Sequence, residues 1–282
     1  MTYKTILTVL THPAEAELAI RSAARMARKL DAHLEILALA VDRTQLGYSY
    51  LGTGAMLLEA GLEQADLEAR RIDAAARAAL HEESTDLRYS VETMVAQIGL
   101  TPELVGSRAR FADLVVLPCP YGTGLGPEAE AVVEAALFDA HAPVLVLPAS
   151  GLGENTLPKR IVLAWNQSAE AMTAARLALP LLKQAEAVSI TVIDPPITGS
   201  DRSDPGGALC QMLVRHGVKA EVAVLARTQT RVSDVLARHA LEINADMLVI
   251  GAYGHSRLRQ AILGGTTRNM LEKAEIPVFM AH

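Results

Sequence analysis

Aromatic residues are scarce in this chain: Phe, Trp and Tyr make up 4% of its 282 residues, although hydrophobic residues make up 50%. Ala, Leu, Val and Ile must therefore fill the core, and this favours helices packed against buried parallel strands. The chain has only two cysteines, Cys119 and Cys210, and these cannot make a disulfide framework. A reducing cytoplasm is the simplest setting for such a composition.

Patterns typical of several other protein classes are also missing. There is no dense run of Lys and Arg and the formal net charge is −6, which argues against nucleic acid as a partner. No apolar run approaches the roughly 20 residues that span a bilayer, so we expect no membrane partner. The start of the chain is too short and polar before its first strand to be a signal peptide. Zinc-site histidine spacings and a nucleophile elbow are absent, so we expect no catalytic residue and no metal ligand.

The chain consists of two similar halves in tandem. Segments 4–10 and 159–165 each place a basic residue before a buried-type strand, and an Ala- and Glu-rich helical stretch follows both. Later, Ala112-Asp-Leu-Val-Val-Leu117 matches Ala245-Asp-Met-Leu-Val-Ile250, and the Pro-Val strands at 142–147 and 276–281 match each other. Because the matches occur in the same order, an internal duplication is the economical interpretation.

Apolar strands alternate with amphipathic helices, which predicts βαβ units with right-handed crossovers. We expect an α/β protein of two tandem Rossmann-like domains, each a five-stranded parallel sheet flanked by helices. The expected strands lie near residues 4–10, 33–41, 87–93, 113–118, 143–148, 159–165, 187–193, 218–225, 246–251 and 276–281. The expected helices lie near residues 14–30, 56–83, 101–110, 128–139, 168–183, 205–216, 230–243 and 257–273.

The segment 149–158 contains Ser, Gly, Asn and Pro between two strands and marks a domain boundary. We therefore expect domains at residues 1–150 and 156–282. The last strand of each half is apolar and is a candidate edge strand, and exposed apolar edges invite pairing. Pairing of the two would join the halves as an intramolecular pseudo-dimer, whereas a homodimer of two chains is left open.

The most informative pattern is Gly251-Ala-Tyr-Gly254, followed nine residues later by Gly264-Gly265-Thr266-Thr267. It follows an apolar run and predicts a strand, a glycine turn, a helix and a second glycine turn. Successive amide N–H groups near a helix start suit phosphate oxygens, and threonine hydroxyls add donors. The first half has no Gly-Gly-Thr-Thr, and Glu128 and Glu130 at its corresponding helix are expected to be partners of the helix dipole.

On these residues the chain resembles the universal stress protein family, in its tandem two-domain form. The nucleotide pattern of that family, G-x2-G-x9-G-[ST], is met at Gly251, Gly254 and Gly264, whereas Gly265 stands where the pattern has Ser or Thr. Asn166 stands where nucleotide-binding members usually place an Asp. The resemblance implies small, often dimeric domains of the adenine nucleotide alpha hydrolase-like kind. Some such domains bind ATP or AMP, and their roles are in stress and regulation.

In open parallel sheets, ligands bind beyond the carboxyl ends of the strands, where the strand order reverses. We expect adenine against Ala164 and Ile250, with Asn166 and Asp194 at the ribose and phosphates near the glycine loop. Each polar residue has an alternative role: Asn166 could form a turn or a helix cap, and Asp194 could hold Mg²⁺ through water or simply end its strand. Trp165 could stack on the base or cap the core. The expected nucleotide-binding residues are Ala164, Trp165, Asn166, Ile193, Asp194, Ile250, Gly251, Tyr253, Gly254, His255, Gly264, Gly265, Thr266 and Thr267.

Three functions are compatible with this sequence. The first is a regulatory stress protein that binds an adenine nucleotide, ATP or AMP, in its second half. The second is a scaffold or interaction module that kept the fold and lost the ligand. The third is a slow ATPase, which would need a water-orienting base and a metal ligand, for which Asp194 is the one candidate.

Overall fold

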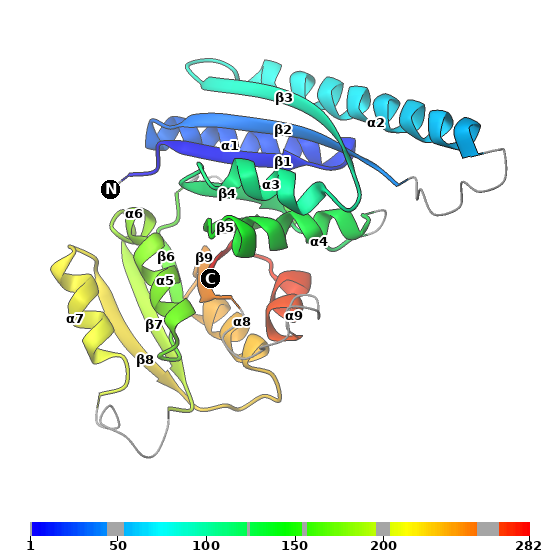
Figure 1. The fold of residues 1–282 in the computed structure, drawn as a ribbon. Helices are drawn as coiled ribbons and strands as arrows, with labels where there is room; N and C mark the ends of the chain where they lie inside the picture. The colour runs from blue at the N-terminus through cyan, green and yellow to red at the C-terminus, as the bar shows by residue number, and fades with distance from the viewer. Residues whose placement is uncertain (1, 44–53, 123–124, 154–156, 196–203, 253–264) are drawn as a thin grey trace. The chain divides into compact units, whose positions relative to one another are not determined.

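A computed structural model describes residues 2–43, 54–122, 125–153, 157–195, 204–252 and 265–282 (Figure 1). They form two compact units, one of Lys4–Ala140 and one of Met1–Tyr3 with His141–His282. Both units are built mainly of parallel strands with helices between them, which confirms the predicted α/β class. Within the described residues, no helix has both the length and the hydropathy needed to cross a membrane.

The N-terminal unit contains a parallel sheet of four neighbouring strands in the order β3-β2-β1-β4. Its strands are β1 (Thr5–Leu10), β2 (His33–Asp42), β3 (Arg88–Gln97) and β4 (Leu114–Pro118). Its helical segments are η1 (Pro13–Glu15), α1 (Ala16–Leu30), α2 (Gly54–Glu83), α3 (Thr101–Ala109), α4 (Pro127–Glu134) and the π-helical turn η3 (Ala135–Asp139).

Two side-chain contacts show how the helices are divided between the faces of this sheet. The Thr93 hydroxyl donates to Asp73 of α2 at 2.8 Å, whereas Arg108 of α3 pairs with Glu92 at 2.6 Å. Because successive strand residues point to opposite faces, α2 and α3 must lie on opposite sides of β3. Helix α1 packs beside α2, and α4 packs beside α3 (Figure 1).

The C-terminal unit continues the same alternation of strands and helices. Its strands are β5 (Val144–Leu147), β6 (Arg160–Ala164), β7 (Ala187–Ile193), β8 (Ala220–Leu225), β9 (Met247–Gly251) and β10 (Val278–Ala281). Its helices are α5 (Ala169–Leu177), α6 (Leu179–Leu182), α7 (Gly207–Arg215), α8 (Val232–Glu242) and α9 (Gly265–Lys273). The strand order is β5-β10-β9-β6-β7-β8, and the pairs from β10 to β8 are all parallel.

Strand β5 pairs with β10 in the antiparallel direction, with Leu145 opposite Phe279. Both strands are fully buried, and Phe279 is 0% exposed. The two apolar strands that were expected to be edges are therefore each other's neighbours. By contacts, β5 belongs to the compact unit of the C-terminal half.

The structure differs from the predicted elements in two places. Strand β3 runs to Gln97, four residues beyond the predicted end at 93, and most of its residues are exposed. The helix predicted at 168–183 is divided into α5 and α6, because Pro180 lies at the start of the second helix and cannot donate to the first. The helix expected from residue 257 is described from Gly265 onward.

Candidate functional site

Three apolar residues of the predicted set lie on one face at the carboxyl ends of β6, β7 and β9. Ala164 is in register with Thr191, and Ile193 follows two residues later on the same side of β7. Leu163 is in register with Val249, so the next residues, Ala164 and Ile250, also point to a common face. The order β9-β6-β7 puts this group where the connections leave β6 in opposite directions, which is the switch point of the sheet.

A row of buried polar side chains that no sequence pattern predicted lies on the same face as this group. The Ser189 hydroxyl lies 3.1 Å from Nε2 of His239 on α8 and 3.4 Å from the Thr191 hydroxyl. All three residues are buried, with Thr191 only 1% exposed. Because Ser189, Thr191 and Ile193 alternate along β7, they share a face, and α8 covers it. The candidate base subsite therefore lies next to a stretch of β7 in which the Ser189 hydroxyl contacts α8 through His239 and the Thr191 hydroxyl contacts Ser189.

Asn166 combines the two roles that the sequence left open. Its side-chain oxygen accepts the Ser168 N–H at 3.1 Å, and the Ser168 hydroxyl accepts the Ala171 N–H at 3.1 Å as the N-cap of α5. Gln167, between them, has a φ of 64°. Since only the oxygen of the amide is used in this turn, its NH₂ group keeps two donors, and the side chain is exposed at the strand end.

The backbone of Gly251 lies close to the first turn of helix α5. A Cβ built on Gly251 would lie 2.4 Å from the Ala171 nitrogen and 2.6 Å from the Glu170 carbonyl carbon, both in the first turn of α5. Because Ala164 and Ile250 point to the opposite face, α5 and the candidate base subsite lie on different sides of the sheet. The glycine is required for packing of α5 on β9.

Trp165 and Asp194 lie at the same sheet edge. The Trp165 N–H continues the ladder by donating to the Thr191 carbonyl at 2.9 Å, and its side chain is half-buried. By strand alternation it follows Ala164 on the opposite face, which favours a core-capping role over stacking. Asp194 is exposed, with a φ of 50°, and ends β7. Among the described residues, no three His, Cys, Asp or Glu side chains are grouped to hold a metal ion.

The glycine loop is described only at its end. Gly265 and Thr266 are the first residues of α9, and Thr267 follows in the same turn with 7% of its surface exposed. The expected residues Tyr253, Gly254, His255 and Gly264 lie outside the described residues. Helix α9 is fastened to α8 by Arg231 to Asn269 at 2.6 Å and Lys273 to Asp234 at 3.3 Å. The phosphate part of the expected site therefore stays a prediction.

The N-terminal half has a carboxylate at the start of the corresponding helix. Glu128, in the first turn of α4, is 9% exposed and forms an ion pair with Arg43, just after β2. Its carboxylate lies against Gly126, the residue that precedes the helix. This position agrees with the expected role as a partner of the helix dipole. A negative charge at this helix start also disfavours a phosphate there.

Comparison with known proteins identifies a family for the C-terminal half of the chain. Residues 158–282 match the model of the Universal stress protein family. A universal stress protein of Synechocystis sp. is 35% identical over 72 residues, which are 26% of this chain and span 24% of that relative. The C-terminal half of the chain is therefore a universal stress protein domain, as the sequence resemblance indicated.

Solved structures extend the likeness of fold to the whole chain. The crystal structure of a universal stress protein from Archaeoglobus fulgidus has a TM-score of 0.68 at 16% identity, covering 98% of this chain and 97% of that one. A functionally unknown protein from Pseudomonas aeruginosa has a TM-score of 0.56 at 17% identity, covering 99% and 92%. The tandem form of the fold is thus shared along the full length.

Proposed function

We propose that the C-terminal domain binds an adenine nucleotide, ATP or AMP, at the carboxyl ends of β6, β7 and β9, and that the protein serves as a regulatory stress protein. The observation that supports this most is the common face of Ala164, Ile193 and Ile250 at the switch point. These small and branched apolar side chains offer a flat surface for a purine ring, which binds by burial of apolar area.

Asn166 follows two residues after Ala164, and its amide NH₂ group, which is not used in the turn, would suit a ribose hydroxyl or an acceptor on the base edge. The phosphates would extend toward Thr266 and Thr267 at the start of α9, where a helix N-terminus favours negative charge. The described carboxylates do not group into a metal site, so Mg²⁺ would enter with the phosphates, with Asp194 at the end of β7 as a candidate carboxylate. We assign no role in hydrolysis to Asp194.

We further propose that the two halves act as an intramolecular pseudo-dimer. The support is the antiparallel pairing of β5 and β10, which end the first and the second sequence repeat. The N-terminal half, with Glu128 at its helix start, would not bind the same phosphate and would instead transmit the state of the other half.

A scaffold without a ligand is the second candidate. It is favoured by Gly251, whose close approach is to α5, and by Asn166, whose oxygen is used in a turn. The two candidates differ in one measurable property, the affinity of the purified chain for adenine nucleotides.

Calorimetric titration with ATP, ADP and AMP tests the proposal. Wild-type protein should bind at least one of them saturably, and Ala164→Phe should abolish binding by filling the base subsite. Asn166→Ala should weaken binding about tenfold, the equivalent of one lost hydrogen bond. Gln184→Ala, which removes an exposed amide two residues after α6, is the control and should bind as wild type does. If Ala164→Phe binds as well as the wild type, the nucleotide does not bind at the ends of β6, β7 and β9. If neither the wild type nor any variant binds a nucleotide, the scaffold function is the remaining candidate.

A further inference from the structure

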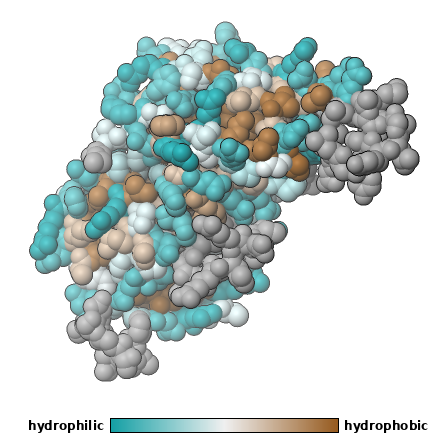
Figure 2. Space-filling model, in the orientation of Figure 1, coloured by the Kyte–Doolittle hydropathy of each residue, from teal (hydrophilic) through white to brown (hydrophobic). Residues whose placement is uncertain are grey.

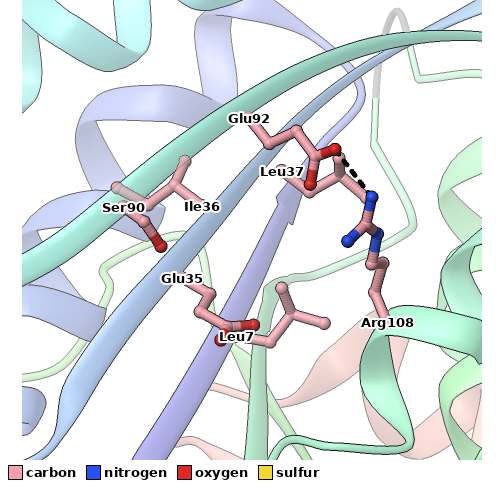
Figure 3. A pocket seen from close by; sticks show the side chains of 7 residues that line it. All are labelled: Leu7, Glu35, Ile36, Leu37, Ser90, Glu92 and Arg108. Carbon is pink, nitrogen blue, oxygen red and sulfur yellow. Dashed lines mark hydrogen bonds and ion pairs between the residues drawn. The ribbon is translucent and has the colours of Figure 1, made fainter.

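The N-terminal sheet carries a groove on the face where α3 packs, and this groove is unconnected with the nucleotide proposal. Two adjoining hollows share Glu35 of β2 and Arg108 of α3 in their linings. The smaller, of about 190 Å³, lies over β1, β2 and β3 (Figure 3). The larger, of about 690 Å³, lies between α3 and the strands. All the lining residues belong to the N-terminal unit.

The larger hollow is bordered by apolar side chains that water reaches. Phe111, just after α3, is 78% exposed and Leu100, just before it, is 53% exposed, with Met94 and Leu104 lining the space between them. Figure 2 shows apolar side chains gathered on this part of the N-terminal unit, over α3 and the end of β3. Single exposed apolar residues are ordinary, but several that line one concave surface mark a site of interaction.

The smaller hollow is acidic. Arg108 is the one cation among the described residues that line the two hollows, and it already pairs with Glu92 at 2.6 Å (Figure 3). Glu35 and Glu103 form no ion pair with another described residue. Glu35 is half-buried beside the buried side chains of Leu7 and Leu37, where a carboxylate gains more from a cation than it would in open water.

A further polar contact fixes the shape of this small hollow. The Ser90 hydroxyl lies 3.1 Å from Nε2 of His33 on the neighbouring strand, and Arg108 reaches Met94 with its guanidinium at 3.8 Å from the sulfur. The hollow is therefore lined by side chains of three strands and one helix, with the Glu35 carboxylate as a charge that forms no ion pair with another described residue.

We propose that this groove binds an amphipathic helical segment of a partner protein, with a Lys or Arg side chain in the Glu35 hollow and apolar side chains on Met94, Leu100, Leu104 and Phe111. Charge complementarity selects the basic side chain, because the two unpaired carboxylates at the groove would repel an acidic segment. A groove between a helix and a sheet with an apolar floor matches the helix-in-groove mode, in which residues at i, i+3, i+4 and i+7 serve as anchors.

The probe is a synthetic fluorescein-labelled helical peptide with Leu at i, i+3, i+4 and i+7 and one central Lys, measured by fluorescence anisotropy against the full chain. Matched peptides carry Gln or Glu in place of the Lys. The Lys peptide should bind saturably, and the Glu peptide should bind at least about tenfold more weakly. Failure of the Lys peptide to bind at millimolar protein, or equal binding of the Glu peptide, overturns the proposal.

Three variants locate the binding. Phe111→Asp should abolish it, and Leu100→Asp is the second variant if the first does not fold, as judged by circular dichroism. Leu241→Asp, at a similarly exposed leucine of α8, is the matched control and should bind normally. Glu35→Gln should weaken the Lys peptide about tenfold and leave the Gln peptide unchanged. Equal loss for both peptides would overturn the assignment of the basic residue, and self-association of the chain that Phe111→Asp removes would show that a second copy occupies the groove instead.

Discussion

The carboxylate of Asp246 accepts the backbone N–H of Lys159 at 3.0 and 2.9 Å, at the point where the first strand of the C-terminal half begins. Arg160 donates its N–H to the same carboxylate at 3.0 Å. In the N-terminal half, Asp113 accepts the N–H groups of Lys4 and Thr5 at 2.7 and 3.0 Å. The Ala-Asp motif that repeats in the sequence therefore fastens the start of the central strand to the strand beside it.

Asp246→Ala should lower the free energy of unfolding of the C-terminal half by about 1–2 kcal/mol, because two backbone donors lose a charged acceptor. Urea unfolding followed by circular dichroism measures the change. The control is Glu186→Ala, which removes an exposed ion pair with Lys159 and should change stability by less than about 0.5 kcal/mol. Equal effects of the two substitutions would show that the carboxylate of Asp246 does not support the strand.

Gly251→Ala should destabilise the C-terminal unit by about 1–3 kcal/mol, since the added methyl group would overlap the backbone of α5. The midpoint of thermal unfolding is the measurement. Gly153→Ala adds the same methyl group in the same unit where no atom lies within 4 Å, so its midpoint should stay near that of the wild type. An unchanged midpoint in Gly251→Ala would mean that the close contact with Ala171 is relaxed at no cost.

Glu15→Gln should stabilise the protein at pH 7. Glu15 is 8% exposed, and its burial raises the pKa of the carboxyl group above its usual value, although hydrogen bonds from Thr11 oppose this. A raised pKa in the folded state means that folding favours the protonated form, so the wild type loses stability as the pH rises through that pKa. Gln keeps the neutral form at every pH.

The expected gain for Glu15→Gln is about 1 kcal/mol at pH 7, and it should vanish as the pH falls below the usual value for a glutamate. Urea unfolding at pH 7 and at pH 4 measures this difference. Glu17→Gln, at an exposed glutamate in the next turn, should show little gain at either pH. A gain for Glu15→Gln that is equal at both pH values would contradict the role of burial.

The sequence was sufficient to predict the fold class and most elements, because apolar strands and Ala-rich helices alternate with little ambiguity. It also placed Ala164, Ile193 and Ile250 at one sheet end, since the carboxyl ends of parallel strands share an edge. The pairing of β5 with β10 followed from two apolar strands that end their halves.

Other features depend on contacts that no local pattern encodes. The sequence did not show that the first turn of α5 lies against Gly251, because only the packing of helix on sheet determines this contact. The hydrogen bond between Ser189 and His239 joins residues 50 positions apart. The sequence around either residue contains no pattern that predicts it. The groove beside Arg108 is formed by three strands and a helix that are far apart in the sequence, and no local pattern in any of them indicates a groove.

The central claim, that a nucleotide base lies at the ends of β6, β7 and β9, is tested most directly by photolabelling the full chain with 8-azido-ATP and mapping the labelled peptides by mass spectrometry. We predict that the label maps to residues 159–194 or 245–252 and that excess ATP or AMP prevents it. Labelling confined to the N-terminal half, or labelling that neither nucleotide reduces, would contradict the account.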